Sequence, residues 1–209
     1  MPQGRIFPPV WERANVVLIP KGGRPAGTPS AYRPICLLDE IGKIFERIIV
    51  GRLVQHLKEV GPDLHEEQFG FREGRSTTDA ILRVRSLAES SMEGSRVLVA
   101  VSLDITNAFN TLPWGKVGDA LTHHGVPQYL VEVVKSYFRS RGLGYRDKSG
   151  AQRQREMYCG VPHGSVLGPL LWDIAYDCII QTALPTAAMS SVMRTTHYYW
   201  PGEWTREKQ

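Results

Sequence analysis

One stretch of the chain, residues 96–105, constrains its architecture more than any other. Its sequence, RVLVAVSLDI, is nearly continuously apolar and β-branched until Asp104. This pattern is typical of a strand covered on both faces, because a strand with one solvated face alternates apolar and polar residues. A carboxylate at such a strand end can hold Mg²⁺ in fixed geometry, although an Asp there is more often a turn former or a helix cap.

The composition of the 209 residues sets wider limits. With 42% hydrophobic and 22% charged residues, the chain is typical of one globular domain or a domain with an appendage. Its net charge of +4 allows an anionic partner without requiring one. Three cysteines without metal-ligand spacing indicate reduced thiols in an intracellular protein and no zinc site. We expect neither a signal peptide nor a membrane span.

The N-terminal half predicts extended pieces and two helices. An extended run at 16–19 leads through a basic Gly/Pro-rich loop to a second extended piece. Apolar residues at helical spacing predict a helix over 37–60 whose other face is charged and exposed. Ser76 and Asp79 resemble a capping box, which would open a second helix shortly after Arg72.

The C-terminal half predicts helices around a hairpin. Residues 106–125 and 126–142 predict two helices, separated at Gly125 to Pro127. A basic hairpin follows and turns at Ser149 and Gly150. Residues 161–180 begin as a Gly/Pro loop and continue as an apolar helix.

Four segments form an ordered set of motifs: YRPICLLDEIGKIFERII, QFGFREGRSTTDAI, VSLDITNAFNTLPW and GVPHGSVLGPLLW. In this order they resemble successive motifs of the reverse transcriptase of non-LTR retrotransposons, with insect elements as the nearest members. The resemblance runs from about Phe7 to Ala183, and four motifs in sequence make it specific.

This resemblance implies an α+β fold of the right-hand polymerase type. Residues 1–95 would form a fingers-like region and residues 96–183 an incomplete palm, without the catalytic hairpin, thumb, endonuclease and flanking domains. The implied reaction is RNA-directed DNA synthesis by two-metal phosphoryl transfer, with Mg²⁺ as cofactor. RNA template, DNA primer and dNTP would be the partners, with no membrane involved, and the protein would act inside the cell, in the nucleus at the site of insertion.

The same mapping implies roles for individual residues. Asp104 would be the first catalytic aspartate and a metal ligand, with the carbonyl of Ile105 as an auxiliary ligand. Phe109 matches the aromatic steric gate that rejects a ribose 2′-hydroxyl, with a core aromatic as the alternative. Arg72 and Lys21 match basic fingers residues that clamp the triphosphate, with a solvated surface charge as the alternative for each.

The loop GVPHGSVLG, residues 160–168, matches the family's lining of the nucleotide and template pocket. Glycines such as Gly164 permit close approach of the backbone. The family usually has Gln where this chain has His163. A neutral imidazole is shorter and supplies one donor and one acceptor, so we expect poorer placement of the nucleotide.

Basic residues around the expected hairpin could contact phosphates of a template–primer duplex, with a solvated hairpin as an equal alternative. They are Arg139, Arg141, Arg146, Lys148, Arg153 and Arg155. Asp173 and Asp177 stand four residues apart on the helix after the loop. The family places this helix away from the metal ions, so we expect both carboxylates to be structural.

The last segment, residues 184–209, departs from the family. The family's remaining catalytic aspartates lie in a YADD hairpin, and no adjacent acidic pair follows Asp177. The same coding DNA can be read in the frame that begins at the third base of each codon. In that frame the codons of HYYWP (197–201) encode Leu-Leu-Leu-Ala whichever synonymous codons are used, and the codons of 192–196 permit Tyr-Ala-Asp-Asp. We therefore hypothesise that a one-nucleotide frameshift replaced the hairpin with a poorly ordered tail. The alternative is an aromatic segment that stacks on bases.

One carboxylate cannot hold two metal ions, so we expect this chain to be inactive alone. Two alternatives stay open at this point. The chain would be a non-catalytic nucleic-acid-binding remnant if it binds RNA without incorporating nucleotides. It would be a pseudogene product without function if it does not fold or is not expressed.

Overall fold

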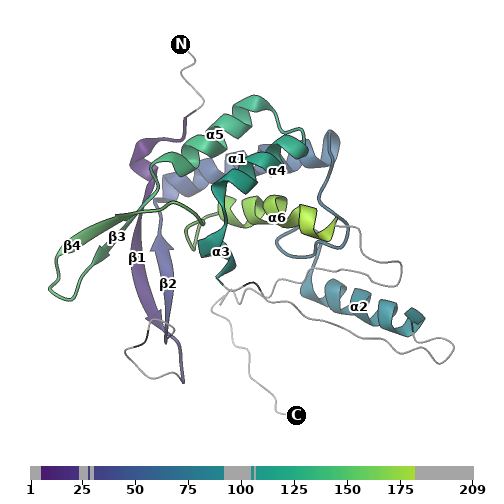
Figure 1. Cartoon of the computed structure of the whole chain (residues 1–209), viewed down its shortest axis with the longest axis horizontal. Helices are drawn as coiled ribbons and strands as arrows, with labels where there is room; N and C mark the ends of the chain where they lie inside the picture. Colours follow the sequence, from purple (N-terminus) through teal and green to yellow (C-terminus); the bar gives the residue numbers. More distant parts are fainter. Residues whose placement is uncertain (1–5, 24–27, 29–30, 92–104, 106, 182–209) are drawn as a thin grey trace. The chain divides into compact units, whose positions relative to one another are not determined.

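The computed structural model describes residues 6–23, 28, 31–91, 105 and 107–181 (Figure 1). The chain divides into two compact units. The first unit comprises residues 1–65 and 100–183, and the second comprises residues 66–99 and 184–209. The apolar strand predicted over 96–105 and the tail predicted over 184–209 lie outside the described residues, apart from Ile105.

The first unit contains a four-stranded sheet of order β2-β1-β3-β4. Strand β1 (Arg13–Pro20) pairs antiparallel with β2 (Tyr32–Leu37), with Val17 opposite Ile35. This pairing confirms the two extended pieces predicted on either side of the basic loop.

A second hairpin joins the other side of β1. Strand β3 (Gly142–Arg146) runs parallel to β1 and antiparallel to β4 (Gln152–Glu156). The backbone N–H of Asp147 donates to the carbonyl of Ala151 at 3.0 Å and closes the turn. The hairpin predicted around Ser149 is therefore confirmed.

Among the described residues of the first unit, five helices surround the apolar core: α1 (Glu40–Glu59), α3 (Ala108–Thr111), α4 (Trp114–His123), α5 (Gln128–Arg139) and α6 (Leu167–Ile180). Helix α4 packs against α5 and α6, and α1 also contacts α6 (Figure 1). Helix α6 is the most buried of them, because it is apolar on nearly all sides. A short 3₁₀ turn, η1 (Pro9–Trp11), precedes β1.

Helix α1 confirms the helix predicted over 37–60 but corrects which face is buried. Asp39 caps it, since its carboxylate accepts from the N–H groups of Ile41 and Gly42. The face expected to be charged and exposed contains Glu46, which is only 2% exposed. Ile41, counted on the apolar face, is 61% exposed.

The single helix predicted over 106–125 is wrong, because the structure divides it into α3 and α4. Leu112 adopts a non-helical conformation (φ −58°, ψ 114°), and Pro113 precedes the first residue of α4. A proline disfavours helical geometry in the residue before it and lacks an N–H to continue the hydrogen-bond ladder. The second expected helix is confirmed as α5.

Buried polar side chains join α1, α4 and α6. The ring of His124, fully buried, has Nδ1 2.7 Å from the carbonyl of Pro62. Asp177 on α6 is 1% exposed and accepts from the N–H of His65 at 2.7 Å. His56 contacts the carbonyl of His124 at 2.9 Å. These contacts fit the expectation that Asp177 is structural, and Asp173 is equally buried.

The second unit contains helix α2 (Thr77–Ser91). The capping box is confirmed, since Ser76 N–H donates to Asp79 at 2.7 Å and Asp79 N–H donates to Ser76 Oγ at 3.2 Å. The Ser76 hydroxyl is also the main cause that lowers the pKa of the Asp79 carboxyl. Arg83 pairs with Glu67 at 2.6 Å. Among the described helices, none is long and apolar enough to cross a membrane.

Candidate functional site

The loop between β4 and α6, residues 160–166, is attached to the segment around α3 by three hydrogen bonds. Gly160 N–H donates to the carbonyl of Leu112 at 2.7 Å, and Val161 N–H donates to the carbonyl of Phe109 at 2.8 Å. The indole N–H of Trp114 donates to the carbonyl of Gly160 at 2.8 Å. The segment that follows Asp104 in the chain therefore holds the start of this loop.

The loop lies so close to the backbone of α3 that no room is left for a side chain at Gly160. Its φ is +79°, and a Cβ there would stand 2.6 Å from the carbonyl oxygen of Asn110 and 2.7 Å from that of Phe109. Both obstacles are backbone atoms, which cannot move aside as a flexible side chain can. Only glycine fits this position.

The opposite side of the loop is attached to strand β2. Cys36 N–H donates to the carbonyl of His163 at 2.8 Å, so the loop covers part of the outer edge of β2. Gly164 has a φ of +111°, and a Cβ there would stand 2.9 Å from the carbonyl oxygen of Cys36. Burial raises the pKa of the Cys36 thiol, which keeps it neutral beside this contact. No disulfide forms among the three cysteines, all of which are described.

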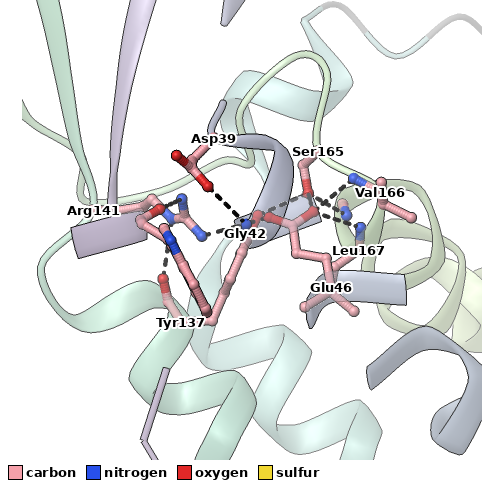
Figure 2. Close-up of polar contacts among 10 residues, drawn as sticks. Asp39, Gly42, Glu46, Tyr137, Arg141, Ser165, Val166 and Leu167 are labelled. Carbon is pink, nitrogen blue, oxygen red and sulfur yellow. Dashed lines mark hydrogen bonds and ion pairs between the residues drawn. The ribbon is translucent and has the colours of Figure 1, made fainter. Parts of the chain in front are cut away.

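The third attachment of the loop is Glu46 of α1, shown in Figure 2. Its Oε2 accepts from Ser165 Oγ at 2.9 Å, from Val166 N–H at 2.7 Å and from Leu167 N–H at 3.1 Å. The side chain of the N-cap residue Val166 does not cap α6. Glu46 and Ser165 Oγ, which accepts from Gly168 N–H at 2.9 Å, supply the acceptors that the first turn of α6 requires. The carboxylate also lies favourably at the positive end of the helix dipole.

Tyr137 and Arg141 complete the surroundings of Glu46 (Figure 2). The Tyr137 hydroxyl lies 2.8 Å from Ser165 Oγ. Because Ser165 uses its single proton on Glu46, Tyr137 donates to Ser165. Burial raises the pKa of Tyr137, so the hydroxyl keeps the proton that this arrangement needs.

Arg141 is 1% exposed, whereas both a phosphate contact and a solvated hairpin require an exposed side chain. Its guanidinium donates to the carbonyls of Tyr137 and Trp11, and one nitrogen lies 3.9 Å from Glu46 Oε1. It stands 3.8 Å from the ring centroid of Tyr137 and 5.1 Å from that of Phe7. The prediction that Arg141 contacts phosphates is therefore wrong, because its guanidinium is buried and interacts with carbonyls and aromatic rings inside the core.

The rings of Phe109 and His163 meet beside the loop. Their centroids are 5.4 Å apart at an interplanar angle of 76°, an edge-to-face contact. Phe109 is 7% exposed, whereas His163 is half-buried. The structure thus brings together three of the predicted site residues, Phe109, His163 and Gly164.

The other predicted site residues are placed separately. Asp104 lies outside the described residues, and Ile105 is 40% exposed. Lys21 is half-buried at the end of β1, where its N–H donates to the carbonyl of Ala31 at 2.7 Å. Arg72 belongs to the second unit and lies in the loop before α2. Among the described residues, no group of three or more His, Cys, Asp or Glu side chains could hold a metal ion.

Two residues that build this site, Glu46 and Arg141, were not predicted to do so. A signal for Glu46 exists in the sequence, because Gly42, Glu46, Ile49 and Leu53 follow the three-and-four spacing of one helix face. All four are buried. Arg141 has no comparable signal, since it follows α5 and its burial depends on the aromatic rings around it.

Comparison with known proteins identifies the family. Residues 19–199 match the sequence model of the family described as reverse transcriptase (RNA-dependent DNA polymerase). The chain belongs to the reverse transcriptase family. The match covers most of the chain and includes β2, the loop at residues 160–166 and α6, and it confirms the resemblance on which the predicted fold rests.

Relatives of this reverse transcriptase domain occur in insect mobile elements. The chain is 35% identical over 174 residues to a probable RNA-directed DNA polymerase from transposon BS of Drosophila melanogaster, covering 81% of this chain and 18% of that protein. It is 34% identical over 200 residues to the RNA-directed DNA polymerase from mobile element jockey of the same species, covering 91% and 21%. The chain therefore spans about one fifth of these relatives.

A solved structure shares the fold. The chain resembles apo telomerase from Candida tropicalis truncated from its C-terminal domain, with a TM-score of 0.58 and 14% sequence identity. The alignment covers 85% of this chain and 40% of the telomerase chain. At this identity the likeness shows the fold alone, and it agrees with the mixed α+β architecture expected of a polymerase domain.

Proposed function

We propose that this chain is part of an RNA-directed DNA polymerase from a retrotransposon, with fingers over residues 1–95 and an incomplete palm over 96–183. In this proposal the loop at residues 160–166 receives the incoming deoxynucleotide. One observation carries it: the loop is attached to both the segment after Asp104 and strand β2, with Phe109 and His163 in contact beside it. A pocket lining must be held in this way if a nucleotide is to be oriented.

Phe109 and His163 would have distinct tasks in this pocket. Phe109 would exclude a ribose 2′-hydroxyl, a role supported by its firm placement through the hydrogen bond between its carbonyl and Val161 N–H. His163 would contact the nucleotide in place of the family's usual Gln. Lys21 would bind the triphosphate through its charge. The same role for Arg72, which belongs to the second unit, stays a prediction from the motif.

The metal ions of this reaction would be Mg²⁺. Asp104 and the carbonyl of Ile105 offer the hard oxygen ligands that Mg²⁺ prefers. Bound Mg²⁺ would activate the primer 3′-hydroxyl and stabilise the leaving pyrophosphate. These two donors do not suffice for two metal ions, so we propose that the 209-residue chain does not polymerise alone.

Primer extension on an RNA template with Mg²⁺ and dNTPs tests this proposal directly. We expect no incorporation above a control without protein. Incorporation that disappears in Asp104→Asn would show that the chain holds a complete metal site and would contradict the proposed inactivity. An Asp119→Asn variant, on the exposed surface of α4, controls for a general effect of removing a carboxylate.

A second candidate function is nucleic-acid binding without catalysis. Arg146, Lys148, Arg153 and Arg155 are exposed on the β3–β4 hairpin, where their charges would contact phosphates. Binding of an RNA oligonucleotide that weakens steeply with salt, together with no binding of deoxynucleotide, would favour this function over a nucleotide pocket.

A further inference from the structure

Glu46 reaches the loop from a distant part of the chain. It is separated by 119 residues from Ser165, yet its Oε2 accepts three hydrogen bonds from three consecutive residues, Ser165 to Leu167. These residues include the end of the loop and the first residue of α6. Any displacement of the carboxylate therefore displaces the loop and the helix start together.

The position of Glu46 is itself determined from two sides (Figure 2). Ser165 Oγ is held by donors from the Tyr137 hydroxyl at 2.8 Å and the Gly168 N–H at 2.9 Å. Arg141 places a positive charge 3.9 Å from the other carboxylate oxygen. Because these partners are buried, solvent does not compete for the carboxylate, and the hydrogen bonds remain directional.

The attachment lies close to the residues assigned to the nucleotide. Ser165 directly follows Gly164, whose backbone closely approaches the carbonyl of Cys36, and stands two residues from His163. The contacts of Gly160 hold only the start of the loop, and the contact between His163 and Cys36 holds its middle. Glu46 is the attachment at its end.

We propose that Glu46 is a positioning residue of the nucleotide pocket, which holds the backbone of the loop so that His163 and Gly164 face the nucleotide correctly. This inference rests on the proposed function of the loop. Glu46 acts through Ser165, Val166 and Leu167 and does not itself touch substrate.

Three variants of the full chain separate positioning from folding. Glu46→Ala removes the acceptor, whereas Glu46→Gln keeps an amide oxygen of similar reach that can accept from Val166 and Leu167. His56→Ala is the matched control, since His56 is another buried polar residue of α1 but contacts the carbonyl of His124 at 2.9 Å, away from the loop.

The first measurement is binding of a fluorescent dNTP with Mg²⁺ to the chain in the presence of an RNA template and DNA primer. We expect Glu46→Ala to weaken this binding about tenfold, because the three hydrogen bonds to the end of the loop and the start of α6 are lost. Affinity for the RNA–DNA duplex alone should change less than about twofold, because the basic hairpin is unaltered. Glu46→Gln should restore most of the dNTP affinity, and His56→Ala should leave it unchanged.

The second measurement is amide hydrogen exchange. We expect Glu46→Ala to accelerate exchange at Val166 and Leu167 about tenfold while His56→Ala does not. Equal acceleration in both variants would mean a general loss of stability and would overturn the proposal. So would faster exchange in Glu46→Ala without any loss of dNTP affinity.

These two measurements also distinguish failure of the inference from failure of the proposed function. If the unaltered chain binds no dNTP, the loop is not a nucleotide pocket and both are overturned. If it binds dNTP and Glu46→Ala binds equally well, the proposed function survives and only the role of Glu46 is overturned.

Discussion

Gly160 is the residue at which the loop comes closest to a neighbouring backbone. Carbonyl oxygens of Phe109 and Asn110 occupy the space that a Cβ would need, at a backbone φ of +79°. Gly150, in the turn of the β3–β4 hairpin, has a similar φ of +83°, but a Cβ there would meet nothing within 4 Å. A side chain at Gly150 would therefore meet only backbone strain, whereas one at Gly160 would meet both backbone strain and steric overlap.

We predict that Gly160→Ala lowers the free energy of unfolding by about 3 kcal/mol or more, because left-handed strain and steric overlap add. Gly150→Ala should cost only about 1 kcal/mol, from the strain alone. Urea denaturation of both variants measures the difference. Equal losses would mean that the loop moves away from α3 without penalty.

Asp147 gives the hairpin a defined pH dependence. Its pKa is lowered to about 2, chiefly by the hydrogen bond from the Ser149 hydroxyl and next by Arg153. A carboxyl whose pKa is lower in the folded state stabilises that state above its unfolded pKa of about 4, and this contribution disappears as the pH falls toward 2.

We therefore predict that the hairpin keeps its native NMR signals from pH 7 to about pH 4 and loses order below that pH. Ser149→Ala should raise the pKa of Asp147 more than Arg153→Ala does, in the order of the two causes. Carboxyl titration by NMR checks this order. A larger effect of Arg153→Ala would mean that the ion pair, and not the hydroxyl, dominates.

Helix α2 is the element whose start depends most clearly on two side chains. Ser76 and Asp79 satisfy each other's backbone N–H groups, and the Ser76 hydroxyl also lowers the pKa of Asp79. We predict that Ser76→Ala raises this pKa and speeds amide exchange in the first turn of α2 on the order of fivefold. Ser86→Ala, exposed on the same helix, is the control. Unchanged exchange in Ser76→Ala would mean that the box does not stabilise the helix.

The elements differ in how well the sequence predicts them. Helices α1, α2, α5 and α6 and both hairpins follow from apolar spacing, caps and turn residues, which act over a few positions. The break between α3 and α4 was missed although Pro113 signals it. The face of α1 was assigned wrongly because a charged residue counts as exposed unless a distant partner satisfies it, and the partners of Glu46 are 119 or more residues away.

The site residues also divide into those that sequence motifs predict and those that only contacts with distant residues place. The motifs predicted Phe109, His163 and Gly164, and the structure brings these three residues together. Arg141 was predicted as a surface cation. Its burial between Phe7 and Tyr137 depends on Phe7, which lies far from it in the chain. No local pattern in the sequence contains that information.

At the scale of the whole molecule, the frame hypothesis makes a prediction about the coding DNA. The family match extends to residue 199, so it includes most of the segment concerned. We predict that the third base of the codons for Arg194 and Thr195 is G, which gives Asp-Asp in the shifted frame. Any other base at these two positions would refute the hypothesis.

Restoring the frame gives a functional version of the same test. A chain re-encoded with one nucleotide inserted between Leu184 and Ala188 should contain YADD and should extend a primer on RNA with Mg²⁺. Incorporation should disappear in its Asp104→Asn variant, which is the control for a contaminating polymerase. A correctly re-encoded, folded chain that remains inactive would mean that further parts of the relatives are required for synthesis.

The sequence by itself determined the family, the order of the main elements and the motif residues of the loop, because these depend on residue type and short spacing. Only the tertiary structure decided that Glu46 caps α6, that Arg141 is buried and that the loop is attached to α3, β2 and α1. These contacts join residues far apart in the chain. Burial removes competing water, so each such contact is stable only where all its partners meet.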